Sequence, residues 1–195
     1  MNTSWNPWDL PPLPTRGDDS ETETYTGIGR VTSTWEMLEM QLSRLYTVFA
    51  GQPDEKEPMD AYGSGNIFRI RLEKLEAIAE RWFIAHPSQD GEGLFDKVLG
   101  HVVSFSDRRN EIAHSIVLNV SPVSVFRSHF EPDALGKPQF AAIPPLHSVR
   151  FHIEGRSHKP RFAYTAPSLK AVSDGALAMC LGVEVFTAGI LVRSR

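Results

Sequence analysis

The feature that most constrains the fold is the spacing of apolar residues after Gly27. On an α-helix, alternating steps of three and four residues place side chains along one face, which is buried against a neighbouring element. Gly51 and Pro53 come after the last of these apolar residues and are expected to end the helix. The sequence therefore predicts a long amphipathic helix from about residue 27 to residue 50. Its apolar positions are Ile28, Val31, Trp35, Leu38, Leu42, Leu45 and Phe49.

Apolar periodicity predicts three further helices. One covers about residues 67–83, and the next begins at about Leu94 and continues to His114. The acidic, glycine-rich residues 51–65 are expected to form a loop, and residues 87–93 a turn. Ser168 is expected to cap the last helix, which continues close to the C-terminus.

Between the third and last predicted helices the spacing of apolar residues shortens to about every second residue. The shorter period covers residues 116–126, 149–153 and 161–164, with proline and glycine between them. Such segments are typical of short strands. We therefore expect a mainly α fold, a four-helix bundle with a small antiparallel β insertion at about residues 116–165, before the last helix.

Residues 1–26 differ in composition from the rest of the chain. They combine four prolines with an acidic, Ser/Thr-rich stretch, and their five carboxylates and one arginine account for a charge equal to the whole chain's net charge of −4. Such a segment buries too little apolar surface to fold alone, so a flexible tail is expected before a domain at residues 27–195. Trp5 and Trp8 either pack back onto that domain or dock into a partner.

The remaining charge is close to balanced, which argues against broad, sequence-independent binding to nucleic acid. Residues 127–161 carry six cations against three carboxylates, with four histidines among them. This stretch is either a solvated hairpin surface or a contact surface for phosphate groups. The scattered His147, His152 and His158 lack metal-ligand spacing with carboxylates or thiols, so no metal site is expected.

The composition favours a folded, cytoplasmic protein. Of 195 residues, 41% are apolar, and the single cysteine, Cys180, excludes an intramolecular disulfide. The N-terminus lacks the basic and apolar regions of a signal peptide. Residues 176–192 are apolar but carry Glu184 and are shorter than the roughly 20 residues of a membrane span, so no membrane partner is expected.

Three glycines recur every seven residues on the last predicted helix, at Gly175, Gly182 and Gly189. An interior glycine costs a helix about 1 kcal/mol relative to alanine. The loss is expected to be compensated by close approach of a second helix. That helix is either the chain's own first or third helix, or the same helix of a twofold partner.

A run of polar and titratable residues closes the third predicted helix. On an ideal helix Asn110 and His114 share one face, and Arg109 lies one step round, within reach of both. The three supply a proton donor or acceptor near neutral pH, an amide that orients it, and a cation whose planar fork suits phosphate. This combination favours chemistry on a phosphodiester.

Four helices, an Arg-Asn-x-x-Ala-His motif late in the third, and an insertion before the last resemble the HEPN superfamily of helical domains that act on nucleic acids. The resemblance covers residues 27–195. It implies that Arg109, Asn110 and His114 form the active site of a metal-independent endoribonuclease that cleaves RNA by acid–base catalysis without a cofactor. It also implies a homodimer in which two motifs face one cleft, and a toxin–antitoxin or antiviral role with an antitoxin or other partner protein.

Two other interpretations of the chain remain open. In a structural one, Asn110 and His114 satisfy carbonyl groups at a helix end, and Arg109 pairs with an acidic residue such as Glu39 on the first helix. In the other, the chain is a non-catalytic helical dimer that binds nucleotide, RNA or a partner protein. As such a scaffold, its tryptophan-containing tail and basic insertion are the working parts.

Overall fold

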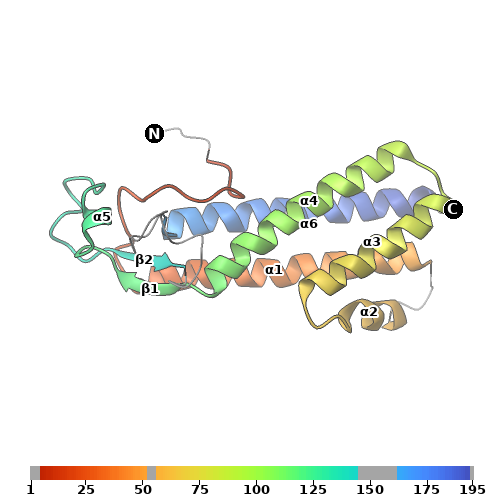
Figure 1. The fold of residues 1–195 in the computed structure, drawn as a ribbon, viewed down its shortest axis with the longest axis horizontal. Coiled ribbons are helices and arrows are strands. Elements are labelled where there is room, and N and C mark those ends of the chain that lie inside the picture. Colours follow the sequence, from red (N-terminus) through yellow and green to blue (C-terminus); the bar gives the residue numbers. More distant parts are fainter. Residues whose placement is uncertain (1–4, 52–55, 145–161, 194–195) are drawn as a thin grey trace, which may run out of the picture. The chain divides into compact units, whose positions relative to one another are not determined.

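The computed structural model describes residues 5–51, 56–144 and 162–193. Within them the chain is mainly helical, with a two-stranded antiparallel sheet before the last helix (Figure 1). This confirms the expected fold at that level. The elements are α1 (Glu21–Ala50), α2 (Lys56–Gly63), α3 (Phe68–Ala85), α4 (Gln89–Ala113), β1 (Ile116–Asn119), α5 (Ser124–Arg127), β2 (Phe140–Ile143) and α6 (Ala166–Arg193).

The sheet differs in detail from the expected β insertion. β1 pairs with β2, with Ile116 opposite Ile143 and Asn119 opposite Phe140. The expected strand over residues 116–126 is wrong beyond Asn119, where a turn leads into α5. β2 lies outside the segments in which strands were expected. Tyr164 adds a single β-bridge to Ala142. The expected strand at residues 149–153, Arg161 and the histidines at 147, 152 and 158 lie outside the described residues.

The starts of two helices differ from the expected ones because of local capping residues, and one helix lies in an expected loop. α1 begins at Glu21, six residues before the expected position, with the Glu23 N–H 3.4 Å from the Ser20 Oγ that accepts its hydrogen bond. A serine followed three residues later by glutamate is a capping box. α4 begins at Gln89 instead of Leu94, and the Gly91 N–H donates to Ser88 Oγ at 3.2 Å. α2 occupies part of the expected loop at residues 51–65.

Two side chains accept hydrogen bonds at the start of α6. α6 begins at Ala166, so Ser168 is its third residue and the expected N-cap position is wrong; its Oγ instead accepts a hydrogen bond from the Thr165 N–H at 2.8 Å. The Ala166 N–H donates to the buried carboxylate of Asp18, at 2.8 and 2.9 Å from its two oxygens. Asp18 also accepts a hydrogen bond from Thr24 Oγ1. One buried carboxylate therefore links the starts of α1 and α6.

The chain divides into two compact units. The first comprises Met1–Trp35 and Val103–Ala176, and the second Glu36–Val102 and Leu177–Arg195. In the first unit α1 and α6 lie side by side (Figure 1), so close that an added Cβ on Gly27 would lie 2.7 Å from Leu169. The core of this unit includes Val31, Trp35, Phe105, Ile112, Phe162, Tyr164, Leu169 and Val172.

Part of the N-terminal segment packs onto the first unit. The Trp8 ring lies 5.5 Å from that of Phe105, centroid to centroid, and its edge lies beside Gly175. The Gly17 N–H donates to Gln139 Oε1, and Asp18 exchanges two backbone hydrogen bonds with Phe140. Of the two possibilities open for Trp8, the structure therefore has it packed on the chain itself.

The second unit is built around aromatic rings from four helices. Phe49 of α1 lies 5.8 Å from Phe83 of α3 and 5.5 Å from Phe95 of α4, and Phe95 lies 6.1 Å from Phe186 of α6, centroid to centroid. α2 is held to this core by Tyr62, whose hydroxyl donates to Glu39 Oε2 at 3.0 Å. Arg71 pairs with the same carboxylate at 2.6 Å.

Candidate functional site

Arg109 is fixed by contacts on two sides. It lies in the last turns of α4, half-buried, with its guanidinium carbon 5.3 Å from the ring centroid of Trp35 on α1. A cation over an aromatic face is attracted by the ring's quadrupole. Arg109 Nη1 also donates to Asn110 Oδ1 at 3.0 Å. The structure therefore brings two of the three expected site residues together through their side chains.

His114 is the first residue after α4. Its backbone N–H donates to the carbonyl of Asn110 at 3.2 Å, which keeps the two residues one helical turn apart. Both side chains are exposed. The imidazole of His114 is therefore accessible to a ligand, and its position is tied to Asn110 through the backbone.

The end of α4 is closed by Ser115. Ser115 Oγ donates to the carbonyl of Glu111 at 2.7 Å, and the Ser115 N–H donates to the carbonyl of Ile112 at 3.1 Å. The carboxylate of Glu39, the acidic partner suggested for Arg109, instead binds Arg71 and Tyr62. The interpretation in which Arg109 pairs with an acidic residue of the first helix stays a prediction.

A second set of polar residues on α4 is buried beside the motif. Arg108 and Glu111 form an ion pair at 2.9 Å, with 6% and 9% of their side chains exposed. The hydroxyl of Tyr164 donates to Glu111 Oε2 at 3.0 Å. Burial and the negative charge of Glu111 raise the pKa of Tyr164 above its usual value, so this hydroxyl stays protonated. We assign this trio to the stability of the first unit.

The two neighbouring arginines thus have different surroundings. Arg108 is buried in an ion pair, and Arg109 is half-buried with its guanidinium over a ring. The sequence showed Glu111 as part of the polar run but not its pairing with Arg108, although residues three apart on a helix are neighbours. The contacts with Trp35 and Tyr164 join distant segments and carried no local signal.

Within the described ranges, no group of three or more His, Cys, Asp and Glu side chains is placed to hold a metal ion. Cys180 is buried, and its burial raises the pKa of the thiol, as expected for a small core residue.

The outer face of α6 in the second unit forms a second candidate surface. Gly182 and Gly189 line an apolar groove of about 510 Å³ between α4 and α6. A Cβ added at either glycine would meet nothing within 4 Å. Val185 beside them is 73% exposed. Of the three glycines, only Gly175 is covered by the chain as described, by the N-terminal segment and not by the first or third helix.

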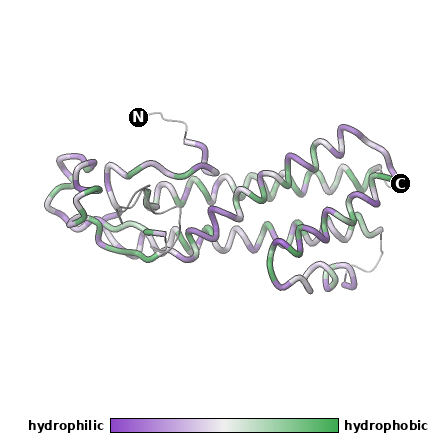
Figure 2. Tube along the Cα trace, in the orientation of Figure 1, coloured by the Kyte–Doolittle hydropathy of each residue, from purple (hydrophilic) through white to green (hydrophobic). Residues whose placement is uncertain are grey.

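α6 is also the described helix that is long and apolar enough to cross a membrane, over Ala166–Val192. Hydrophobic and neutral residues dominate it (Figure 2). A core helix in a soluble protein meets the same criterion, and 28% of the most apolar window is buried in this chain.

No family model, curated protein or solved structure matches this chain.

Proposed function

We propose that the protein is a metal-independent endoribonuclease that cleaves RNA by acid–base catalysis at Arg109, Asn110 and His114. The observation that carries this proposal is that an anchored cation and an accessible imidazole lie five residues apart at the end of α4. Arg109 is held over Trp35 and by Asn110, and the exposed His114 follows one turn after Asn110. A fixed cation stabilises charge that develops on a phosphoryl group without having to be reoriented.

The chemistry assigns one role to each side chain. The 2′-oxygen of the RNA attacks phosphorus, the bond to the 5′-oxygen breaks, and a cyclic phosphate forms. His114 assists removal of the 2′-hydroxyl proton or protonates the leaving 5′-oxygen. Arg109 stabilises the negative charge on the phosphoryl oxygens. Asn110 positions Arg109 or the substrate.

The reaction has two proton transfers, and each copy of the motif has one imidazole. A homodimer in which two motifs face one cleft would supply both. The open groove at Gly182 and Gly189 supports association through α6, because interior glycines weaken a helix unless something approaches closely. We include the homodimer in the proposal, together with a cytoplasmic toxin–antitoxin or antiviral role with an antitoxin or other partner protein.

The proposal is tested by incubating a mixed RNA pool with purified protein in EDTA. The wild type is expected to cleave RNA, and His114→Ala is expected to lose the activity while keeping its circular dichroism spectrum. His101→Ala is the matched control, because His101 is exposed on the same helix and outside the motif. It is expected to retain full activity. Equal loss in both variants would contradict the assignment of His114.

A second candidate is a non-catalytic helical dimer that binds RNA, nucleotide or a partner protein. The exposed apolar groove on α6 favours it, because large exposed apolar patches mark association surfaces. The two candidates differ in the effect of Arg109→Ala. A binding module loses affinity and has no turnover to lose, whereas a ribonuclease loses cleavage rate.

A further inference from the structure

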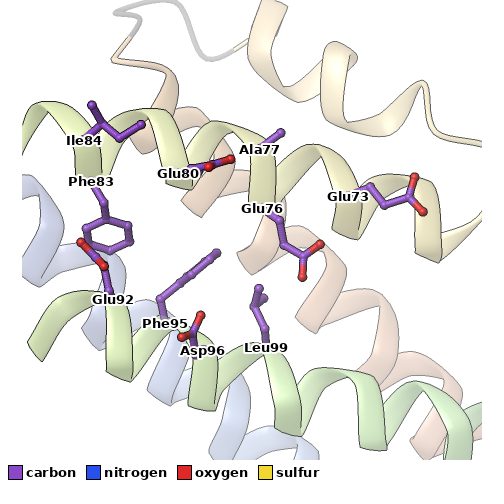
Figure 3. A pocket seen from close by; sticks show the side chains of 10 residues that line it. All are labelled: Glu73, Glu76, Ala77, Glu80, Phe83, Ile84, Glu92, Phe95, Asp96 and Leu99. Carbon is purple, nitrogen blue, oxygen red and sulfur yellow. The ribbon is translucent and has the colours of Figure 1, made fainter. Parts of the chain in front are cut away.

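A groove between α3 and α4 in the second unit combines an apolar floor with an acidic rim (Figure 3). Its volume is about 650 Å³. Phe83, Phe95 and Leu99 form the floor and are largely buried, whereas Ile84 beside them is 73% exposed. An exposed isoleucine next to a hydrophobic floor offers contact area to an apolar side chain from outside.

Five carboxylates surround this floor, and its described lining residues include no lysine or arginine. Glu73 pairs with Arg69 at 3.5 Å. The other four have no ion pair among the described residues. They are Glu76 and Glu80 on α3, and Glu92 and Asp96 on α4.

The acidic side chains are neighbours along each helix. Glu76 and Glu80 are four residues apart, as are Glu92 and Asp96. Like charges at this spacing destabilise a helix. Two such pairs facing one groove make its potential strongly negative, which repels phosphate groups and anionic lipids. The groove therefore requires a partner that carries positive charge.

We propose that this groove docks a basic amphipathic helix of a partner protein. Lining residues extend along α3 from Glu73 to Ile84, which corresponds to about 16 Å or three helical turns. A helix of that length lays an aliphatic stripe on Phe83 and Phe95, with lysine or arginine on both sides reaching the carboxylates. This surface lies outside the RNA site and does not depend on the proposed ribonuclease activity.

The test measures binding of a synthetic helix to the full-length protein. The probe is a labelled 14-residue peptide of leucine and lysine, with leucine at helical spacing, followed by fluorescence anisotropy. Glu76→Gln, Glu80→Gln, Glu92→Gln and Asp96→Asn are combined in one groove variant, which is expected to bind at least tenfold more weakly. Ile84→Asn is expected to weaken binding at least threefold. Circular dichroism confirms that each variant is folded.

Two matched controls separate docking from general attraction to an acidic protein. The first neutralises four exposed carboxylates outside the groove, at Glu21, Glu57, Asp60 and Glu184, and is expected to keep nearly full affinity. The second is a peptide with the same lysines but serine in place of leucine, which is expected to bind weakly. Equal loss in the groove and control variants would overturn the proposal. So would equal binding of the serine peptide, full displacement by spermidine alone, or no binding to the wild type.

Discussion

Replacing Arg108 by methionine is expected to destabilise the protein far more than the same change at Arg109, its neighbour. Arg108→Met removes the cation that pairs with Glu111, a carboxylate whose side chain is 9% exposed and which still accepts a hydrogen bond from Tyr164. Breaking a buried ion pair in this way costs about 3–5 kcal/mol. For a chain of this size that corresponds to a fall in Tm of roughly 6–20 °C.

Arg109→Met removes a cation from the face of Trp35 and one hydrogen bond to an exposed amide. A cation–π contact is worth about 0.5–2 kcal/mol. The methionine sulfur can still contact the ring, which offsets part of the loss. We therefore expect a cost of about 1 kcal/mol, while RNA cleavage or RNA binding is lost.

The measurement is urea unfolding of both variants, followed by circular dichroism. Adding Glu111→Gln to Arg108→Met should recover part of the loss, because it removes the uncompensated charge. A cost below about 1.5 kcal/mol for Arg108→Met, well short of that of a broken buried pair, would refute the reasoning. So would a larger cost for Arg109→Met.

Three further outcomes follow from the packing and from the shifted pKa values. Gly27→Ala should destabilise the protein by about 1–3 kcal/mol, because the added Cβ meets Leu169. Gly182→Ala should instead add about 1 kcal/mol of helix stability and weaken any self-association measured by sedimentation. A destabilising effect of Gly182→Ala would contradict this. Burial and a nearby carboxylate raise the pKa of Tyr62 and Tyr164 above 10.0. As the pH rises, the unfolded chain therefore loses these protons before the folded protein does. The free energy of unfolding should be unaffected below pH 10 and should fall above it by about 1.4 kcal/mol per pH unit for each tyrosine. A free energy of unfolding in urea that does not change from about pH 10 to 11 would contradict this pH dependence. Asp18→Ala should cost about 2 kcal/mol through loss of the α6 cap. Asp18→Asn should cost less, because its amide oxygen can still accept the hydrogen bond from the Ala166 N–H; equal Tm values for the two variants would rule this out.

The helices could be predicted from the sequence because their apolar periodicity is local information. Val31, Trp35, Leu38 and Leu42 show the spacing of a buried face, and all four are buried. Helix ends depend on single capping residues, and the signal at Ser20 was present but unused. β2 contains two alanines, which have weak strand preference, and is stabilised by pairing with β1 more than twenty residues earlier. Such long-range pairing leaves no pattern in β2 itself.

The candidate site could be predicted only in part. Helical geometry was enough to place Asn110 and His114 one turn apart, and it brought Arg109 within reach of Asn110. Periodicity put Trp35 on a buried face without identifying the side chain that covers it. The α3–α4 groove could not be predicted from the sequence, because only the packing of two helices brings its carboxylates around one apolar floor.

The measurement that tests the central claim most directly is the cleavage of one RNA and of its copy with 2′-deoxy sugars, in EDTA, by the wild type and by His114→Ala. The account predicts that the wild type cleaves the RNA alone and leaves cyclic phosphate ends, and that His114→Ala cleaves neither substrate. Equal cleavage of the deoxy copy, equal activity of His114→Ala, or no cleavage by the folded wild type would contradict it.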